Sequence, residues 1–162
     1  MTNREFFIQR WNAEYPAFVK VFRALPPDRL DYRPHPRSRS AAELVWLLAQ
    51  EEQAGVELIN TGQIDWKETP PPGSLDEMTG AYERSHAELA GRLEKLDEAA
   101  WESRGKFLLD GQLIMEETLG QTFWLFLFDA VHHRGQLSVY IRPMGGKVPS
   151  IYGPSADDPG SM

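Results

Sequence analysis

Apolar side chains recur at helical spacing along four stretches of the chain that contain almost no proline. The first stretch covers residues 3–25, and its apolar positions are Phe6, Phe7, Trp11, Tyr15, Phe18, Val19, Phe22 and Leu25. Steps of three and four residues place these side chains on one face and predict a helix. Pro16 lies inside the stretch and, because proline cannot donate a backbone hydrogen bond, it predicts a kink or an early break.

Two further helices are predicted to begin with the same capping signal. Ser40 stands three positions before Glu43, and Ser74 stands three positions before Glu77. A serine followed in this way by a glutamate is typical of a helix N-terminus. The apolar stripe of the first of these helices includes Leu44, Leu47, Leu48, Glu51, Gly55, Leu58 and Ile59, and that of the second Leu75, Met78, Tyr82, Leu89, Leu93 and Leu96. The first ends near Gly62 and the Pro70–Pro72 run.

The most apolar part of the chain, residues 123–128, predicts a last helix from about Met115 to Arg142 that stops at Pro143. Ahead of it, Asp110-Gly111 lies between apolar pairs and is compatible with a small β-hairpin. The tail from Gly145 onward is rich in Gly, Pro, Ser and Asp and predicts irregular structure. Four helices joined by mostly short connections favour one all-α domain over residues 1–162, an antiparallel four-helix bundle.

The amino-acid composition excludes several classes of function and of site. With 17 Lys and Arg against 24 Asp and Glu, the formal net charge is −7, which disfavours nucleic acid and anionic membranes as partners. The absence of cysteine excludes disulfides, thiol nucleophiles, iron–sulfur clusters and cysteine-type zinc sites, and it fits a cytoplasmic, reducing compartment. We find no signal peptide and no apolar run long enough to span a bilayer. A metal would therefore need carboxylates or the four histidines, His35, His86, His132 and His133.

Asp129 follows the apolar run directly, and His133 lies one helical turn further on the same face. We expect this carboxylate to lie inside the protein, where it would need a partner or a metal because an unpaired buried charge is costly. An aspartate and a histidine at this spacing can share a divalent ion. They can equally form a simple hydrogen-bonded pair, or Asp129 can bind a facing arginine.

Glu51 falls within the apolar stripe of the second predicted helix, and Glu52 fits an alternative stripe. We expect Glu51 to point inward and to face Asp129 and His133 across the helices. The alternative is that both glutamates lie at the edge of the stripe in water. We expect His86 to be a partly exposed helix residue and His35 to be a solvated loop residue.

Two other polar residues of the last helix are assigned structural positions. Arg134 and Gln136 are expected to point away from the line of Asp129 and His133, with Arg134 paired to Glu5 or Glu14. The aromatic residues of this helix, including Phe123, Trp124 and Phe128, are candidates for a dimer interface or for core packing.

Three motifs together suggest a family. They are His132-His-Arg-Gly-Gln136, the helix opening Ser40-Ala-Ala-Glu-Leu-Val, and the later run Arg142-Pro-Met-Gly-Gly-Lys-Val-Pro-Ser-Ile-Tyr-Gly-Pro-Ser. With these motifs the chain resembles the DinB/YfiT-like superfamily of metal-dependent bundle proteins. The resemblance implies a four-helix bundle, often a homodimer, with nickel or zinc held by three histidines and one open position. Some members transfer small thiols or isomerise thiol adducts.

Carried over residue by residue, the resemblance places the family's three histidines at Leu47, Asp129 and His133, so only His133 is retained. Two outcomes follow. In one, Glu51, Asp129 and His133 rebuild a site for iron, manganese, zinc or nickel, with Glu51 as third ligand or as catalytic base. In the other, the metal is lost, Leu47 fills the space, and Asp129 and His133 bind each other.

These outcomes correspond to two function hypotheses. The first is a metal-dependent enzyme of thiol-transferase or hydrolase type that acts on a small molecule, with or without a thiol cofactor. The second is a metal-free, non-catalytic homodimer that binds a small ligand or acts in a stress response.

Overall fold

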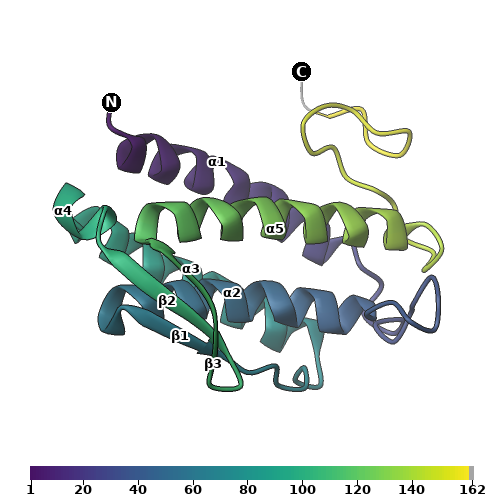
Figure 1. Cartoon of the computed structure of the whole chain (residues 1–162). Helices are drawn as coiled ribbons and strands as arrows, with labels where there is room; N and C mark the ends of the chain where they lie inside the picture. Colours follow the sequence, from purple (N-terminus) through teal and green to yellow (C-terminus); the bar gives the residue numbers. More distant parts are fainter. Residues whose placement is uncertain (161–162) are drawn as a thin grey trace.

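The computed structural model of the chain describes residues 1–160 and consists mainly of helices (Figure 1). Its four long helices are α1 (Asn3–Arg23), α2 (Ala41–Thr61), α3 (Leu75–Lys95) and α5 (Leu119–Ile141). The smaller elements are the single-turn helix α4 (Glu98–Trp101) and the strands β1 (Gln63–Trp66), β2 (Arg104–Leu109) and β3 (Gln112–Thr118). Among the described residues, none of the helices is both long and apolar enough to cross a membrane.

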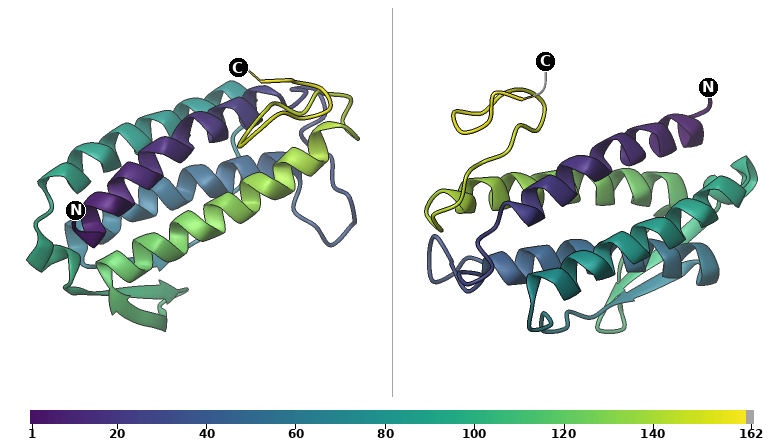
Figure 2. Two further views of the ribbon diagram at one scale, coloured as in Figure 1. Left: turned by 90° about the horizontal axis from the view of Figure 1, so that it is seen from above. Right: turned by 180° about the vertical axis from the view of Figure 1, so that it is seen from behind.

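The long helices lie side by side, and each contacts two of the others (Figure 2). Helix α2 packs against α3 and α5, and α1 packs against the same two helices from the other side. Close packing around α2 depends on Gly55. A Cβ atom at this position would lie 2.9 Å from Leu89 of α3 and 3.1 Å from Phe123 of α5. Glycine therefore lets α2 approach both neighbours one turn after Glu51.

The helix ends follow the capping chemistry. Ser40 forms both hydrogen bonds of a capping box with Glu43, and the Ser74 side chain accepts a hydrogen bond from the Glu77 backbone. Helix α1 continues through Pro16 to Arg23, so an early break does not occur. The loss of one backbone hydrogen bond is offset there by apolar residues packed on both sides of the proline, among them Trp11 and Phe18.

A three-stranded sheet beside α5 shows that the all-α prediction was wrong. Its order is β1-β2-β3, with β1 parallel to β2 and β2 antiparallel to β3. The β2–β3 pair is the hairpin that Asp110-Gly111 suggested, and both turn residues have positive φ angles, 51° and 78°. Strand β1 was not predicted, because it is only four residues long and its partner lies about 40 residues further along the chain.

The hairpin also shifts the start of the last helix. Residues 115–118 belong to β3, and α5 begins at Leu119 rather than at Met115. Thr118 caps the helix through a capping box with Gln121. The C-terminal end lies close to the prediction, with Ile141 as the last helical residue and Arg142 as the cap. Beyond it, the described part of the tail carries no helix or strand, as expected.

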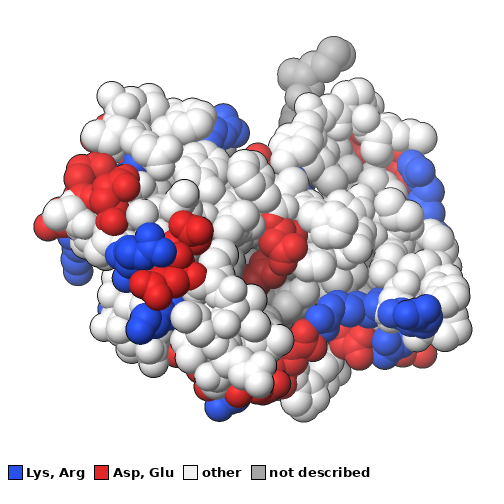
Figure 3. Space-filling view, viewed as in Figure 1, with Lys and Arg blue, Asp and Glu red and all other residues white. Residues whose placement is uncertain are grey.

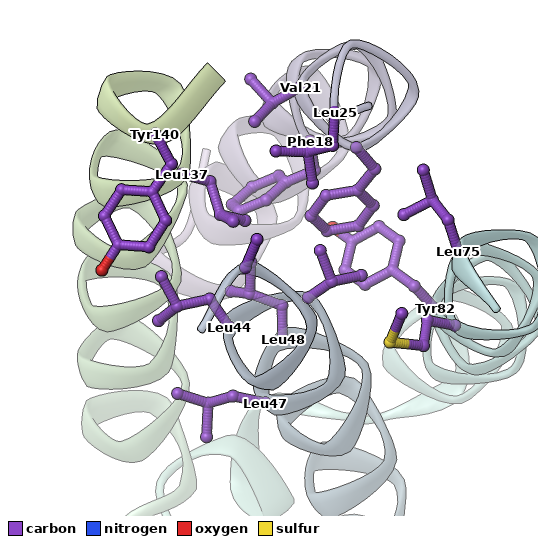
Figure 4. Packing of buried hydrophobic residues seen from close by; sticks show 14 of the residues in the cluster. Phe18, Val21, Leu25, Leu44, Leu47, Leu48, Leu75, Tyr82, Leu137 and Tyr140 are labelled. Carbon is purple, nitrogen blue, oxygen red and sulfur yellow. The ribbon is translucent and has the colours of Figure 1, made fainter. Parts of the chain in front are cut away.

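The core fills the space between the long helices (Figure 4). One cluster of the core contains buried residues from all four helices. Among its members, Phe22, Leu44, Met78 and Leu137 are each at most 1% exposed. Leu47 belongs to the same cluster but lies at its edge, between α2 and α5. One side of Leu47 therefore faces away from the core, toward the sheet side of these two helices.

Candidate metal centre

Helices α2 and α5 bring Glu51, Asp129 and His133 together. One ligand atom from each side chain lies within 4.8 Å of those of the other two. Glu51 comes from the middle of α2, and the other two residues come from one turn of α5. The expectation that Glu51 faces Asp129 and His133 across the helices is met by this geometry.

Asp129 and His133 form a pair along α5. Asp129 Oδ2 lies 3.2 Å from His133 Nε2. On the other side of the ring, His133 Nδ1 donates a hydrogen bond to Gln136 Oε1 over 2.8 Å. The expectation that Gln136 points away from this line was wrong, because residues three positions apart on a helix are neighbours. Gln136 fixes the ring so that Nε2 faces the carboxylates.

Asp129 is more exposed than its position after an apolar run suggested. Its side chain is 55% exposed, whereas that of His133 is 16% exposed. The expectation of a buried aspartate was therefore wrong. The apolar run goes round the helix, and two of its members, Leu125 and Phe128, are themselves exposed. Asp129 thus stands at the mouth of the site, where ligands can enter from solvent.

Glu51 is the buried member of the set, with 8% exposure. Burial, reinforced by a hydrogen bond with Asp129, raises the pKa of Glu51 well above its ordinary value. The hydrogen bond with His133 lowers the pKa of Asp129, and the same bond raises the pKa of His133. Of the two carboxyl groups, Glu51 therefore keeps its proton to higher pH, and Asp129 is the one that ionises first.

One oxygen of Glu51 has no partner. Glu51 Oε2 is buried and lacks a hydrogen bond to any described residue. A buried oxygen without a partner costs free energy on the order of 1–3 kcal/mol. Two carboxylates and one imidazole are also donors that a divalent first-row ion accepts. The residues present therefore fit a divalent cation.

An open pocket of about 230 Å³ adjoins the three residues. Its apolar walls come from Leu47, Trp66, Phe107 and Phe126, and its polar rim from Arg39 and Glu68. Arg39 donates a hydrogen bond of 2.9 Å to Glu68, so its charge is paired. Trp66 belongs to β1 and Phe107 to β2, which explains what the sheet contributes to the site. Sequence patterns did not reveal Trp66 and Phe107 as wall residues, because the sheet pairing that brings them there is long-range.

Leu47 occupies a place in this wall and is 7% exposed. It shares the pocket with Glu51, Asp129 and His133. The resemblance noted in the sequence predicts a histidine of the family at this position. Its side chain points into the space between α2 and α5 (Figure 4). An apolar side chain cannot ligate a metal, so Leu47 adds wall but no ligand.

Glu52 points inward as well, although the sequence left its direction open. It is 8% exposed and accepts a hydrogen bond of 3.1 Å from Trp11 Nε1. His86 Nδ1 lies 3.4 Å from the same oxygen, and the His86 ring stacks between Trp11 and Tyr15. The expectation that His86 is partly exposed was therefore wrong, because aromatic rings of α1 cover it. The alternative that both glutamates lie in water was wrong too.

Other residues singled out in the sequence lie outside the site. Arg134 is buried and pairs with Glu14 over 2.7 Å, which confirms one of its two predicted partners. His35 is exposed in its loop, as expected. Phe123 is buried in the core at 2% exposure, whereas Phe128 is 64% exposed. The core assignment therefore holds for Phe123, and Phe128 remains a surface residue.

The chain is similar to known proteins in sequence and in fold. The DinB family model matches residues 1–160. A DinB-like protein of Bacillus cereus has a similar structure, with a TM-score of 0.74 and 22% identity over 91% of this chain and 97% of that protein. For a DinB-like protein of Bacillus subtilis (YjoA), the TM-score is 0.68 and the identity is 19%, over 87% of this chain and 93% of that protein.

A more distant structure is that of a mutant mycothiol-dependent maleylpyruvate isomerase. Its TM-score is 0.55 and its identity 14%, over 92% of this chain and 63% of the isomerase. At these identities the three structures establish a shared fold. A search of the curated proteins gave no match.

Proposed function

The chain belongs to the DinB family, and we propose that it binds a divalent cation through Glu51, Asp129 and His133 for a metal-dependent reaction on a small molecule. The observation that carries this proposal is the convergence of three ligand atoms within 4.8 Å of one another beside an open pocket. The Glu51 carboxyl group supports it as well, because one of its oxygens is buried without a partner and a cation bound by this group would offset that cost.

Each residue has a separate task in this proposal. His133 presents Nε2 to the site while Gln136 holds its other nitrogen. Asp129, at the mouth, supplies a carboxylate that is already ionised. Glu51 is either the third ligand or a base that takes a proton from the substrate. A raised pKa suits the second task, because an efficient base titrates near the working pH.

A divalent cation bound here would polarise a substrate group or lower the pKa of a water or thiol in its coordination shell. Trp66, Phe107 and Phe126 would keep bulk water away from the reacting groups. Two oxygen donors and one nitrogen make a harder site than three histidines and suit iron, manganese or zinc better than metals that prefer thiolate ligands. Thiol transfer, thiol-dependent isomerisation and hydrolysis are the proposed reaction classes. The thiol-dependent classes come first because one structural neighbour is mycothiol-dependent.

The second candidate is a metal-free, non-catalytic protein that binds a small ligand. The 3.2 Å contact between Asp129 Oδ2 and His133 Nε2 favours it, because these two side chains can satisfy each other without an ion. Leu47 favours it too, since an apolar residue at a family ligand position lowers affinity for metals. The two candidates differ in one measurable property, cation binding.

Metal analysis and calorimetry separate them. Protein purified without chelator is assayed for metal content, and apo protein is titrated with Zn²⁺ and with Mn²⁺. We expect near-stoichiometric binding by the wild type, and loss of it in the Asp129→Ala and His133→Ala variants. The His35→Ala variant is the control, because His35 is an exposed loop residue that does not line the pocket. Wild-type protein that binds neither ion would overturn the proposal and leave the second candidate.

A further inference from the structure

An apolar groove lies between the β2–β3 hairpin and α5, beside the candidate metal centre. Its volume is about 530 Å³, within the range of small-molecule sites. The groove is lined mainly by Phe107, Ile114, Met115, Leu125, Phe126 and Phe128. Three of these are largely open to solvent, with exposures of 60% for Ile114, 49% for Leu125 and 64% for Phe128. So many exposed apolar side chains in one place indicate a binding surface.

The groove adjoins the pocket of the metal centre. Phe107, Phe126 and Asp129 line both of them. Phe107 and Phe126 meet edge to face, with ring centroids 6.1 Å apart, and form the common wall. Asp129, whose side chain is 55% exposed, lies at the border between the two. A molecule with its polar end at Glu51, Asp129 and His133 can therefore extend its remainder along the groove.

The charge of the lining restricts the chemistry of the part of the molecule that lies in the groove. Apart from the six apolar residues, the groove is bordered by Asp129 and His132, and neither Lys nor Arg is part of it. The lining therefore holds no Lys or Arg side chain that could pair with a carboxylate or phosphate on the ligand's arm. In the space-filling view, the surface over the middle of α5 is largely uncharged around one acidic patch (Figure 3). An uncharged alkyl or aromatic arm fits this lining.

We propose that the substrate of the metal centre is amphipathic, with a small metal-coordinating head and an uncharged apolar arm that lies in the groove between the hairpin and α5. The inference rests on the proposed function, because it takes the head of the molecule to be held at Glu51, Asp129 and His133. It adds the chemical class of the arm and the residues that select it.

The test uses straight-chain hydroxamic acids, whose two oxygens coordinate divalent ions, from acetohydroxamate to octanohydroxamate. Their dissociation constants are measured by calorimetry with Zn²⁺-loaded full-length protein. We expect the constant to fall by at least about tenfold from the shortest to the longest chain, because each buried methylene adds to binding. The Leu125→Ser variant should lose this dependence and keep the wild-type affinity for acetohydroxamate.

Val139→Ser is the matched control, because Val139 is an exposed apolar residue of the same helix, 71% exposed, that does not line the groove. It should behave as wild type. If acetohydroxamate binds but the dissociation constant does not change with chain length, the groove proposal alone would be overturned. Failure of acetohydroxamate to bind the loaded protein would overturn the proposed function and this inference with it. If affinity does not change with chain length, and the wild type is a dimer that the Leu125→Ser substitution dissociates, the groove would instead bind a second copy of the chain.

Discussion

Asp129 Oδ2 and His133 Nε2 lie 3.2 Å apart on one turn of α5, with Glu51 of α2 completing the group from the neighbouring helix. Because the three side chains are so close, the protonation of each one depends on the others: the pKa of Asp129 is lowered and the pKa values of His133 and Glu51 are raised. A cation would have to displace protons from two of the three residues. The coupling and the residues that surround it determine how the protein should respond to pH and to mutation.

Glu51→Gln should stabilise the metal-free protein as pH rises. The pKa of Glu51 is raised on folding, so its contribution to stability is complete below its unfolded pKa and is lost as pH increases through the folded pKa. Glutamine does not ionise, so the variant avoids this loss. At high pH the gain in the free energy of unfolding is about 1.4 kcal/mol for each unit by which the pKa is raised. Urea denaturation with chelator present, at about pH 6 and about pH 8.5, measures the difference.

The matched control for this change is Glu57→Gln, because Glu57 is an exposed residue of the same helix. It should shift stability little, and equally at both pH values. A Glu51→Gln protein whose stability relative to wild type does not increase with pH would contradict the assignment of the proton to Glu51.

Cation affinity should increase with pH. Glu51 and His133, whose pKa values are raised, carry protons that must leave before they can act as ligands, whereas Asp129, whose pKa is lowered, is already ionised. We expect Zn²⁺ to bind at least about tenfold more weakly at about pH 5.5 than at about pH 7.5. Calorimetry in buffers of different ionisation enthalpy measures the protons released. Binding without proton release at the lower pH would disagree with this scheme.

Leu47→His should strengthen the site. Leu47 lines the same pocket as Glu51, Asp129 and His133, so an imidazole there adds a nitrogen ligand. Affinity for Zn²⁺ or Ni²⁺ should rise by about tenfold or more, because a fourth protein ligand closes the tetrahedral shell. Titration of apo protein measures this change.

Leu44→His serves as the control for that experiment. Leu44 is 1% exposed on the same helix and does not line the pocket. Its replacement should destabilise the fold, since it buries a polar ring, and should leave cation affinity unchanged. Equal affinities for the wild type and a folded Leu47→His protein would refute the position assigned to Leu47.

Trp11→Phe should destabilise the protein through Glu52. The indole N–H donates the 3.1 Å hydrogen bond to Glu52 Oε1, and Glu52 Oε2 has no partner among the described residues. Loss of a donor to a buried acid costs about 1–3 kcal/mol, which thermal or urea unfolding can detect. Trp46→Phe removes a comparable bond, to Thr69, from a more exposed position, and it should cost less. Equal costs would argue against a special role for the buried pair.

Local spacing in the sequence was enough to predict much of the helical structure. The capping serines predicted where α2 and α3 begin, and the spacing of Asp129 and His133 predicted their pairing. Glu51 could be added because its place in an apolar stripe indicated the inward face of α2. These properties depend on neighbours within one or two helical turns, which a helix places reliably.

Properties set by distant parts of the chain could not be predicted. Trp66 and Phe107 reach the pocket through β1 pairing with β2, a contact that no local pattern encodes. His86 is buried because Trp11 and Tyr15 of α1 stack on its ring. The exposure of Asp129 depends on which side of an apolar helix the hairpin leaves uncovered. In each case tertiary packing decides the outcome.

Anomalous diffraction from crystals grown with Zn²⁺, collected on both sides of the zinc absorption edge, shows directly whether Glu51, Asp129 and His133 bind a cation. We expect one strong anomalous peak between α2 and α5, within coordination distance of His133 Nε2 and carboxylate oxygens of Asp129 and Glu51. We also expect the peak to be absent from crystals of the His133→Ala variant. A map without a peak there, with Asp129 and His133 still in contact with each other, would rule out cation binding at these residues.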